Sequence, residues 1–391
     1  MVVYYVLAAI SCWFGLQSLL SGIRYAAYVR RETSRSLPDF QPFVSVIAPG
    51  RGLEPGLIDN LRPLVAQDYP RYEVLFVFDA LDDPAIKIVD ELRRTTAVPA
   101  RTVIAGPATD SGQKVHNLRV AVNEIDPESE VLVFVDSDAR PAKYWIRKLV
   151  APLADETLGA STGYRWFIPL RGGIASRLRS VWNASVASAL GSDTSKNFCW
   201  GGSTAIRRTT FTNLDVSSHW RGTVSDDFTI TRVLKEAKLP IHFTPNCLVA
   251  SVGDCDFREL LEFTTRQIKI TRVYAQHLWL PLLLGSALFA VAFFGGLILI
   301  GVNPRSSAAY IFPLIIFALG AAKSFLRFRA ISTVLQTSHA DLLAHVFLWP
   351  FASLLYLYNA VAAGFSRRIK WRGITYELKS PREAVIISRD S

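Results

Sequence analysis

The stretch that decides the fold class is Glu130-Val-Leu-Val-Phe-Val-Asp-Ser-Asp138. Its run of β-branched and aromatic apolar residues predicts a buried strand, and the two acidic residues follow at the strand's carboxyl end. Before it, strand-like and helix-like segments alternate along the chain. The apolar, strand-like runs lie at 43–49, 72–78 and 102–105, and the segments with helical spacing lie at 58–67, 85–94 and 115–124. This alternation predicts an α/β fold with a doubly wound, mostly parallel sheet.

Long apolar runs lie outside this region, at both ends of the chain. Only 19% of the residues are charged, whereas about a quarter are charged in a typical soluble protein. The runs at 2–27, 278–302 and 308–326 are each long enough to cross a bilayer as a helix. We therefore expect a transmembrane anchor at 1–29, an α/β domain with an interfacial segment at 30–277, and membrane helices with a basic tail at 278–391.

A last apolar run, at 342–365, is interrupted by Pro350. Proline breaks or kinks a helix, so this run is either a full span or a kinked, re-entrant hairpin. Basic residues prefer the cytosolic side of a membrane, and they cluster after both the first and the last apolar run. The hairpin would keep both clusters on one side, so the charge pattern favours it and a cytosolic α/β domain.

The net charge of +10 has two interpretations, nucleic-acid binding or contact with anionic lipid. The basic residues flank apolar runs, and no nucleic-acid-binding module is recognisable, so we expect a membrane partner and no nucleic acid. The four cysteines show no CxxC spacing, which gives no indication of a zinc site or a disulfide framework. The arginine-rich composition favours a bacterial inner membrane over endoplasmic reticulum or Golgi.

Asp136 and Asp138 are candidate metal ligands. Two carboxylates at i and i+2 after a buried strand repel each other unless a cation lies between them, and hard oxygen ligands suit Mg²⁺ or Mn²⁺ bound to a diphosphate. The competing interpretation is a simple turn or helix cap, where aspartate is also favoured.

A second acidic pair, in Ser225-Asp226-Asp227-Phe228, precedes a segment with helical spacing. One of these aspartates could cap the helix or act as a general base. Cations that could neutralise a leaving diphosphate are Lys114 and, at spacings of three on one helical face, Arg266, Lys269 and Arg272. A basic helix on a membrane surface is the alternative explanation for these three residues, and for Arg272 in particular.

The chain resembles known glycosyltransferases in an ordered series of short stretches. These are Val44–Pro49, Gly52-Leu-Glu-Pro55, Asn60-Leu61, Gln67-Asp-Tyr-Pro-Arg-Tyr-Glu-Val74, Asp82-Asp-Pro-Ala-Ile86, Lys114-Val-His-Asn-Leu118, Gly201-Gly-Ser-Thr-Ala-Ile-Arg-Arg208 and Asp226-Asp-Phe228. The resemblance covers nearly the whole chain. It is to family 2-type (GT-A) glycosyltransferases, and most closely to the ceramide glucosyltransferase family and its bacterial lipid-glycosylating relatives.

This resemblance implies a GT-A fold with three aspartate motifs and a final basic/aromatic motif. The first aspartate would hold the uridine of a UDP-sugar. A gap-free alignment on Asp82-Asp-Pro puts Ala80 at that position, so we expect Asp79 there, with Asp82 as its substitute. The second motif, Asp136 and Asp138, would hold the metal and the diphosphate.

The resemblance further implies that Asp227 is the base and that Gly201 and Gly202 lie in the substrate site. The last motif, (Q/R)xxRW, is matched by residues 266–270, with Lys269 in place of the arginine and Ile270 in place of the tryptophan. Lysine keeps the charge but loses bidentate phosphate binding, and the acceptor site loses an aromatic surface.

The sequence therefore predicts an inverting hexosyltransferase that moves one sugar from a UDP-sugar to a membrane lipid at the cytosolic face. Candidate acceptors are a ceramide, a diacylglycerol, a hopanoid or an isoprenoid. A processive polysaccharide synthase would need more spanning helices for a channel. A catalytically silent membrane scaffold is disfavoured because it would have no reason to keep several buried like charges.

Overall fold

The computed structural model describes residues 2–302 and 307–390. The chain forms two compact units. The first, which we call the helical unit, comprises Met1–Arg31, Ile168–Ala189 and Asp254–Arg367. The second, the sheet unit, comprises Glu32–Phe167, Leu190–Gly253 and Arg368–Ser391.

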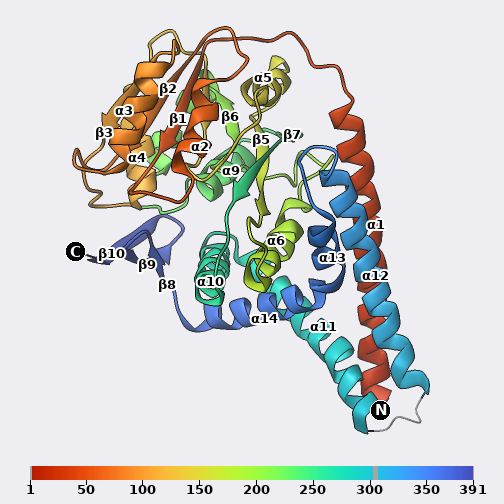
Figure 1. The fold of residues 1–391 in the computed structure, drawn as a ribbon. Coiled ribbons are helices and arrows are strands. Elements are labelled where there is room, and N and C mark those ends of the chain that lie inside the picture. The colour runs from red at the N-terminus through yellow and green to blue at the C-terminus, as the bar shows by residue number, and fades with distance from the viewer. Residues whose placement is uncertain (1, 303–306, 391) are drawn as a thin grey trace. The chain divides into compact units, whose positions relative to one another are not determined.

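The sheet unit is built on seven strands in the order β3-β2-β1-β4-β6-β5-β7 (Figure 1). The pairs β3–β2, β2–β1 and β1–β4 are parallel, and β6 is antiparallel to both β4 and β5. The predicted mostly parallel α/β sheet is confirmed. The strands are β1 (Val44–Pro49), β2 (Tyr72–Phe78), β3 (Ala100–Ile104), β4 (Val131–Phe134), β5 (Ala160–Ile168), β6 (Thr204–Arg207) and β7 (Ile241–Val252).

Helices connect the parallel strands, and α4 packs against β1 and β2. The segment predicted as one helix at 58–67 is split by Pro63, which supports only a 3₁₀ turn after a short α2. The helical elements of this unit are α2 (Leu57–Leu61), η1 (Arg62–Val65), α3 (Ala85–Thr95), α4 (Gln113–Ala121), α5 (Trp145–Val150), η2 (Ala151–Ala154), α7 (Arg208–Asn213), α8 (Val216–His219) and α9 (Asp226–Glu236).

An apolar core packs around the strands of the sheet. Leu75, Phe134, Ile206 and Trp220 are buried in one cluster. The rings of Phe134 and Trp220 meet edge to face at 5.5 Å, a geometry that stabilises beyond the area it buries. The strands that carry the acidic residues are therefore held rigidly.

The C-terminal residues form a second, three-stranded antiparallel sheet within the sheet unit. Its strands are β8 (Arg368–Trp371), β9 (Ile374–Ser380) and β10 (Glu383–Arg389). The backbone N–H of Gln113 donates to the Tyr376 hydroxyl at 3.1 Å, and Arg389 donates to the Ala108 carbonyl at 2.6 Å. The sequence had grouped these residues with the membrane helices as a basic tail, whereas the structure groups them with the sheet.

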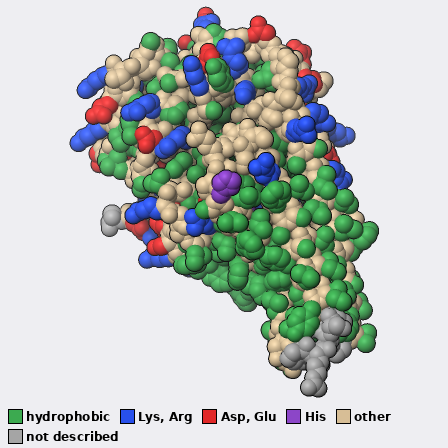
Figure 2. Space-filling model, turned by 45° about the vertical axis from the view of Figure 1, so that its right-hand side comes forward, with side chains coloured by type: hydrophobic (Ala, Val, Ile, Leu, Met, Phe, Trp, Pro, Cys, Tyr) green, Lys and Arg blue, Asp and Glu red, His purple; other side chains and the backbone are tan. Residues whose placement is uncertain are grey.

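Among the described residues, the helical unit contains three helices that are long and apolar enough to cross a membrane, at Val2–Thr33, Gln276–Val302 and Tyr310–Ile331. Figure 2 shows hydrophobic side chains gathered over the region of these helices, and Trp13, Leu284 and Leu314 are among the exposed ones. The helices of this unit are α1 (Val2–Thr33), α6 (Ile174–Ala187), α10 (Phe257–Tyr274), α11 (Gln276–Val302), α12 (Ser307–Ile331), α13 (His339–Phe347) and α14 (Trp349–Phe365).

The last apolar run is broken, as the sequence predicted. Helices α13 and α14 meet at an angle of 59°, and Pro350 lies in the first turn of α14, where its missing N–H is tolerated. The pair is long and apolar enough to count as one broken span or as a re-entrant loop. The sequence Asn303-Pro-Arg-Ser-Ser307 predicts a short turn between two of the long apolar runs, and this turn lies, apart from Ser307, outside the described residues.

Candidate active site

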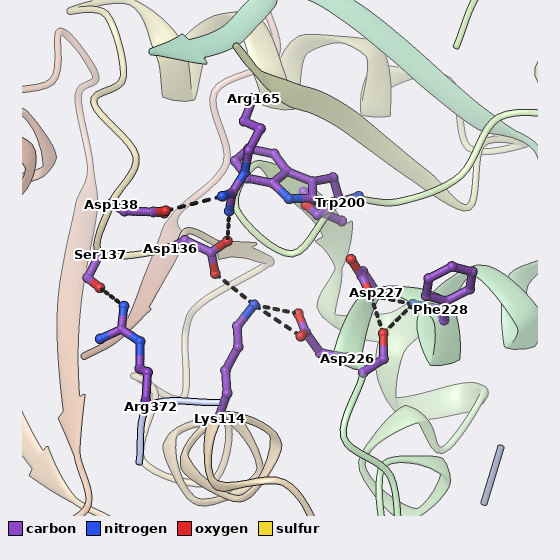
Figure 3. Close-up of polar contacts among 12 residues, drawn as sticks. Lys114, Asp136, Ser137, Asp138, Arg165, Trp200, Asp226, Asp227, Phe228 and Arg372 are labelled. Carbon is purple, nitrogen blue, oxygen red and sulfur yellow. Dashed lines mark hydrogen bonds and ion pairs between the residues drawn. The ribbon is translucent and has the colours of Figure 1, made fainter. Parts of the chain in front are cut away.

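Four charged side chains meet at the carboxyl edge of the parallel strands (Figure 3). Asp136 and Asp138 follow the buried strand β4, and Lys114 lies in the first turn of α4. The Lys114 Nζ atom is 2.7 Å from Asp136 Oδ1 and 3.0 Å from Asp226 Oδ1. The strand-end position predicted for the two aspartates brings them to a cation that is more than twenty residues away along the chain.

Burial and the neighbouring charges shift the pKa values of this cluster in opposite directions. Burial lowers the pKa of Lys114, but the carboxylates of Asp136 and Asp226 outweigh it, so the net pKa is raised and the ammonium stays charged. Burial raises the pKa of Asp136, and Lys114 and Arg165 more than reverse this. For Asp226, which is only 2% exposed, burial prevails over Lys114 and raises the pKa to about 6.

Gly201 and Gly202 make room for this cluster. A Cβ atom on Gly201 would lie 2.1 Å from Asp226 Oδ2 and 2.8 Å from Lys114 Nζ. A Cβ atom on Gly202 would lie 2.2 Å from the Trp200 ring and 2.8 Å from Asp136 Oδ2. The two glycines predicted for the substrate site therefore line the charged cluster, and any larger residue would displace it.

Asp226 and Asp227, at the start of α9, have different surroundings. Asp226 is buried against Lys114, whereas Asp227 is half-buried. The Asp227 Oδ1 atom accepts hydrogen bonds from the Ser225 hydroxyl and from the Phe228 N–H at 2.7 Å. Figure 3 shows its other oxygen on the side of Trp200. Of the two carboxylates, Asp227 is the more exposed.

The alternatives Asp79 and Asp82 both follow β2, where the sequence placed them. Asp79 lies directly after the strand, with its Oδ2 atom 3.5 Å from Arg51 Nε. Asp82 is exposed in the following turn. Neighbouring Asp83 has a local structural role, because it accepts from the backbone N–H groups of Gly52 at 2.8 Å and Ala85 at 2.9 Å. The geometry favours Asp79 for ligand contact.

Two arginines at the site did not emerge from the sequence. Arg165, in the middle of β5, donates to Asp136 at 3.1 Å and to Asp138 at 3.2 Å. Arg372, in the turn between β8 and β9, donates to Ser137 Oγ at 3.3 Å and to the Glu54 carboxylate. The available signal for Arg165 was that it is the only charged residue of β5. Arg372 lies in the segment at 278–391 that the sequence grouped as membrane helices with a basic tail.

Glu54 is a further acidic group beside Asp136 and Asp138. Burial raises its pKa, and Arg372 opposes that shift. Its Oε2 atom accepts a hydrogen bond from Ser137 Oγ at 3.3 Å. The C-terminal sheet is thus tied to the turn that holds the aspartates.

The remaining predicted cations, Arg266 and Lys269, lie on α10 in the helical unit. Both side chains are half-buried, and burial lowers the pKa of Lys269. The Arg266 guanidinium lies over the Phe263 ring at 5.6 Å. Neighbouring Arg272 has a structural role, because it donates to the Ala363 carbonyl and stacks on Trp279 at 5.2 Å.

A divalent cation fits the two carboxylates of Asp136 and Asp138. Within 2–302 and 307–390, no cluster of three or more acidic, histidine or cysteine side chains could hold a metal by itself. Mg²⁺ and similar ions are commonly held by one or two carboxylates, with the other positions filled by substrate phosphates and water. Asp138 Oδ1 is buried and has no hydrogen-bond partner among the described residues, so it is an acceptor that a cation would satisfy.

A mostly parallel α/β sheet with aspartates at its carboxyl edge agrees with the GT-A glycosyltransferase fold that the sequence resemblance had implied. The chain matches the family described as Glycosyl transferase family 21 over residues 3–384, and it belongs to that family.

Individual relatives share less with the chain. It is 28% identical to Ceramide glucosyltransferase 3 of Caenorhabditis elegans over 124 residues, which are 30% of this chain and only 26% of that protein. A mannosyltransferase of Pyrobaculum calidifontis, solved with GDP-Man and Mn²⁺, aligns with a TM-score of 0.48 and 20% identity over 92% of this chain and 99% of its own. Glucosyl-3-phosphoglycerate synthase of Mycobacterium tuberculosis aligns with a TM-score of 0.36 and 14% identity over 62% and 80%.

Proposed function

We propose that this protein transfers a single sugar from a UDP-sugar to a membrane lipid at the cytosolic face, with inversion at the anomeric carbon. The observation that carries the proposal is the site itself: a half-buried carboxylate, Asp227, beside a buried cluster of Lys114, Asp136 and Asp226 in a family 21 glycosyltransferase. Inverting transfer needs one base for the acceptor hydroxyl and positive charge for the leaving diphosphate.

In this proposal Asp227 accepts the proton of the acceptor hydroxyl while the sugar is attacked from the opposite face. Its Oδ1 atom is held by Ser225 and Phe228, which fixes the carboxylate for this role. Lys114 keeps Asp136 in place and adds positive charge near the diphosphate. Asp136 and Asp138 would hold a divalent cation, Mg²⁺ or Mn²⁺, which when bound supplies further positive charge to the leaving group.

The nucleotide would lie along the carboxyl edge of β2 and β4, since ligands of such sheets bind there. Asp79, next to Arg51, is proposed to hold the uridine. Gly201 and Gly202 would leave space for the sugar beside Asp136 and Asp226.

A lipid acceptor is supported by the three helices that are long and apolar enough to span a membrane. We propose a multi-pass protein with a cytosolic sheet unit, in a bacterial inner membrane. Arg266 and Lys269, on the helix just before the second of these helices, are proposed to contribute positive charge to the substrate. The ceramide glucosyltransferase relative makes a ceramide-like lipid the first acceptor to test.

The test is transfer from a panel of radiolabelled UDP-sugars into a total lipid extract, with purified protein in detergent and Mg²⁺ or Mn²⁺. A discrete labelled glycolipid, identified by mass spectrometry, would support the proposal and name donor and acceptor together. A high-molecular-weight product would instead indicate a processive synthase. Donor binding without transfer to any lipid would indicate a silent scaffold.

The matched variants for this test are Asp227→Asn and Glu236→Gln, which each remove one negative charge from α9. Asparagine keeps the side-chain oxygen that accepts from Ser225 and Phe228, so Asp227→Asn should fold, bind donor normally and lose transfer by roughly a hundredfold or more. Glu236, exposed at the far end of the helix, should be dispensable. Near-normal turnover in Asp227→Asn would remove this residue from the role of base.

A further inference from the structure

Arg165 occupies the place between the two aspartates of the Asp136-Ser-Asp138 motif. Its NH2 nitrogen lies 3.1 Å from Asp136 Oδ2, and its NH1 nitrogen lies 3.2 Å from Asp138 Oδ2 (Figure 3). One guanidinium therefore bridges both carboxylates, with a different nitrogen for each. Asp136 Oδ1 already lies 2.7 Å from Lys114 Nζ, so a divalent cation that binds Asp136 would compete with Arg165 for Oδ2.

The guanidinium is held firmly in this position. The side chain is only 12% exposed. Its guanidinium carbon lies 4.9 Å from the centre of the Trp200 ring and 5.4 Å from that of Phe167, which are favourable cation–π distances. Burial lowers the pKa of Arg165, but Asp138 and Asp136 more than compensate, so it is a permanent positive charge.

Arg165 satisfies the motif incompletely. It contacts only one oxygen of Asp138, and the other, Oδ1, is buried without a partner among the described residues. An unsatisfied buried carboxylate oxygen costs free energy, and a ligand that reaches it recovers that cost. The motif is thus neutralised by Arg165, but Asp138 Oδ1 remains an acceptor for a ligand.

We propose that Arg165 is an internal counter-ion that must leave the aspartates before a divalent cation can bind, and that the donor's diphosphate is what receives it. This inference rests on the proposed function. A displaced guanidinium in a buried site is costly when it has no anionic partner. The diphosphate supplies that partner, and arginine binds phosphate well through its forked donors. Metal and nucleotide therefore bind weakly alone and tightly together.

Linkage makes this proposal measurable. If displacement of Arg165 couples the two ligands, then UDP must tighten Mn²⁺ binding by the same factor by which Mn²⁺ tightens UDP binding. We expect a coupling of about tenfold or more in the unmodified protein. Without Arg165, Mn²⁺ alone should bind roughly tenfold more tightly, and the coupling should fall by about the same factor because only the direct contact between metal and diphosphate still contributes to it.

The experiment measures binding of Mn²⁺ alone to the full-length protein in detergent, by the loss of the free-ion electron paramagnetic resonance signal, with and without UDP. The variants are Arg165→Gln, Arg165→Lys and the control Arg93→Gln, which removes an exposed arginine from α3. If Arg165 acts only through its positive charge, Arg165→Lys should bind Mn²⁺ and couple it to UDP as the unmodified protein does. Displacement predicts that it resembles Arg165→Gln, because one ammonium cannot bridge both carboxylates as a fork does.

A second readout guards against poor folding. Removing Arg165 leaves two neighbouring carboxylates without their bridge, so Mn²⁺ should raise the melting temperature of Arg165→Gln more than that of the unmodified protein. Unchanged or weaker binding of Mn²⁺ by both variants, with undiminished coupling to UDP, would overturn the proposal. If coupling and its loss are observed but no lipid is labelled, then the inference about Arg165 stands and the proposed transferase activity fails.

Discussion

Replacing Lys114 by methionine tests the charged cluster most directly. Methionine keeps most of the apolar stem but removes the ammonium that lies 2.7 Å from Asp136 and 3.0 Å from Asp226. Removing one partner of a buried ion pair typically costs about 3–5 kcal/mol, because the remaining charge has no compensation. Asp136 keeps Arg165 as a partner, so Asp226 bears most of this cost.

The cost must depend on pH. The folded-state pKa of Asp226 is already raised to about 6, so protonation can relieve its isolation. A carboxyl group whose pKa is raised in the folded state contributes its full stability below its unfolded pKa, and this contribution is lost as the pH rises through the folded pKa. Without Lys114, the only large opposing influence is gone and the folded pKa rises further. The stability of Lys114→Met therefore keeps falling up to a higher pH than that of the unmodified protein, by at most about 1.4 kcal/mol per pH unit.

The assay compares melting temperatures of Lys114→Met and the unmodified protein in detergent at pH 5.5 and pH 8. The difference should be larger at pH 8, where Asp226 must ionise. Lys196→Met is the control, because Lys196 pairs only with exposed Asp193 and such pairs contribute less than about 1 kcal/mol. An equal difference at both pH values, or a larger one at pH 5.5, would refute the assignment of Asp226 as a buried carboxylate stabilised by Lys114.

Three further changes test other contacts of the site. Asp138→Ala should weaken donor binding only when Mg²⁺ or Mn²⁺ is present, measured by titration with UDP; unchanged metal dependence would exclude Asp138 as a ligand. Gly201→Ala should lower stability by about 1–3 kcal/mol, because its Cβ would lie 2.1 Å from Asp226 Oδ2. Gly191→Ala, where a Cβ meets no atom within 4 Å, should melt normally, and equal melting of both variants would contradict the packing argument. Arg372→Gln should raise the pKa of Glu54 further, so stability should fall more steeply with rising pH than in the unmodified protein. The control is exposed Arg382→Gln in the same sheet, and identical pH profiles for the two variants would argue against the contact.

The local pattern of the sequence determined the fold class and the site's location. A strand such as Val131–Phe134 can be predicted because its residues are all apolar and partly β-branched. The residues that follow it must then lie at the edge of the sheet. The three helices that are long and apolar enough to span a membrane can be predicted for the same reason, because a bilayer requires a long, uninterrupted apolar run. Pro350 likewise marked the break between α13 and α14, since the effect of proline is local.

Tertiary structure decided which charges meet. Lys114 and Asp226 are 112 residues apart, and nothing in either local sequence identifies the other as its partner. Arg165 and Arg372 were hidden for the same reason: one lies within a strand, the other in a segment that looked like a membrane-flanking tail. The exposure that distinguishes Asp227 from Asp226 also follows from packing. Ion pairs form between side chains that folding brings together, so their pairing depends on the arrangement of β4, β5, α4 and α9 rather than on any one of them.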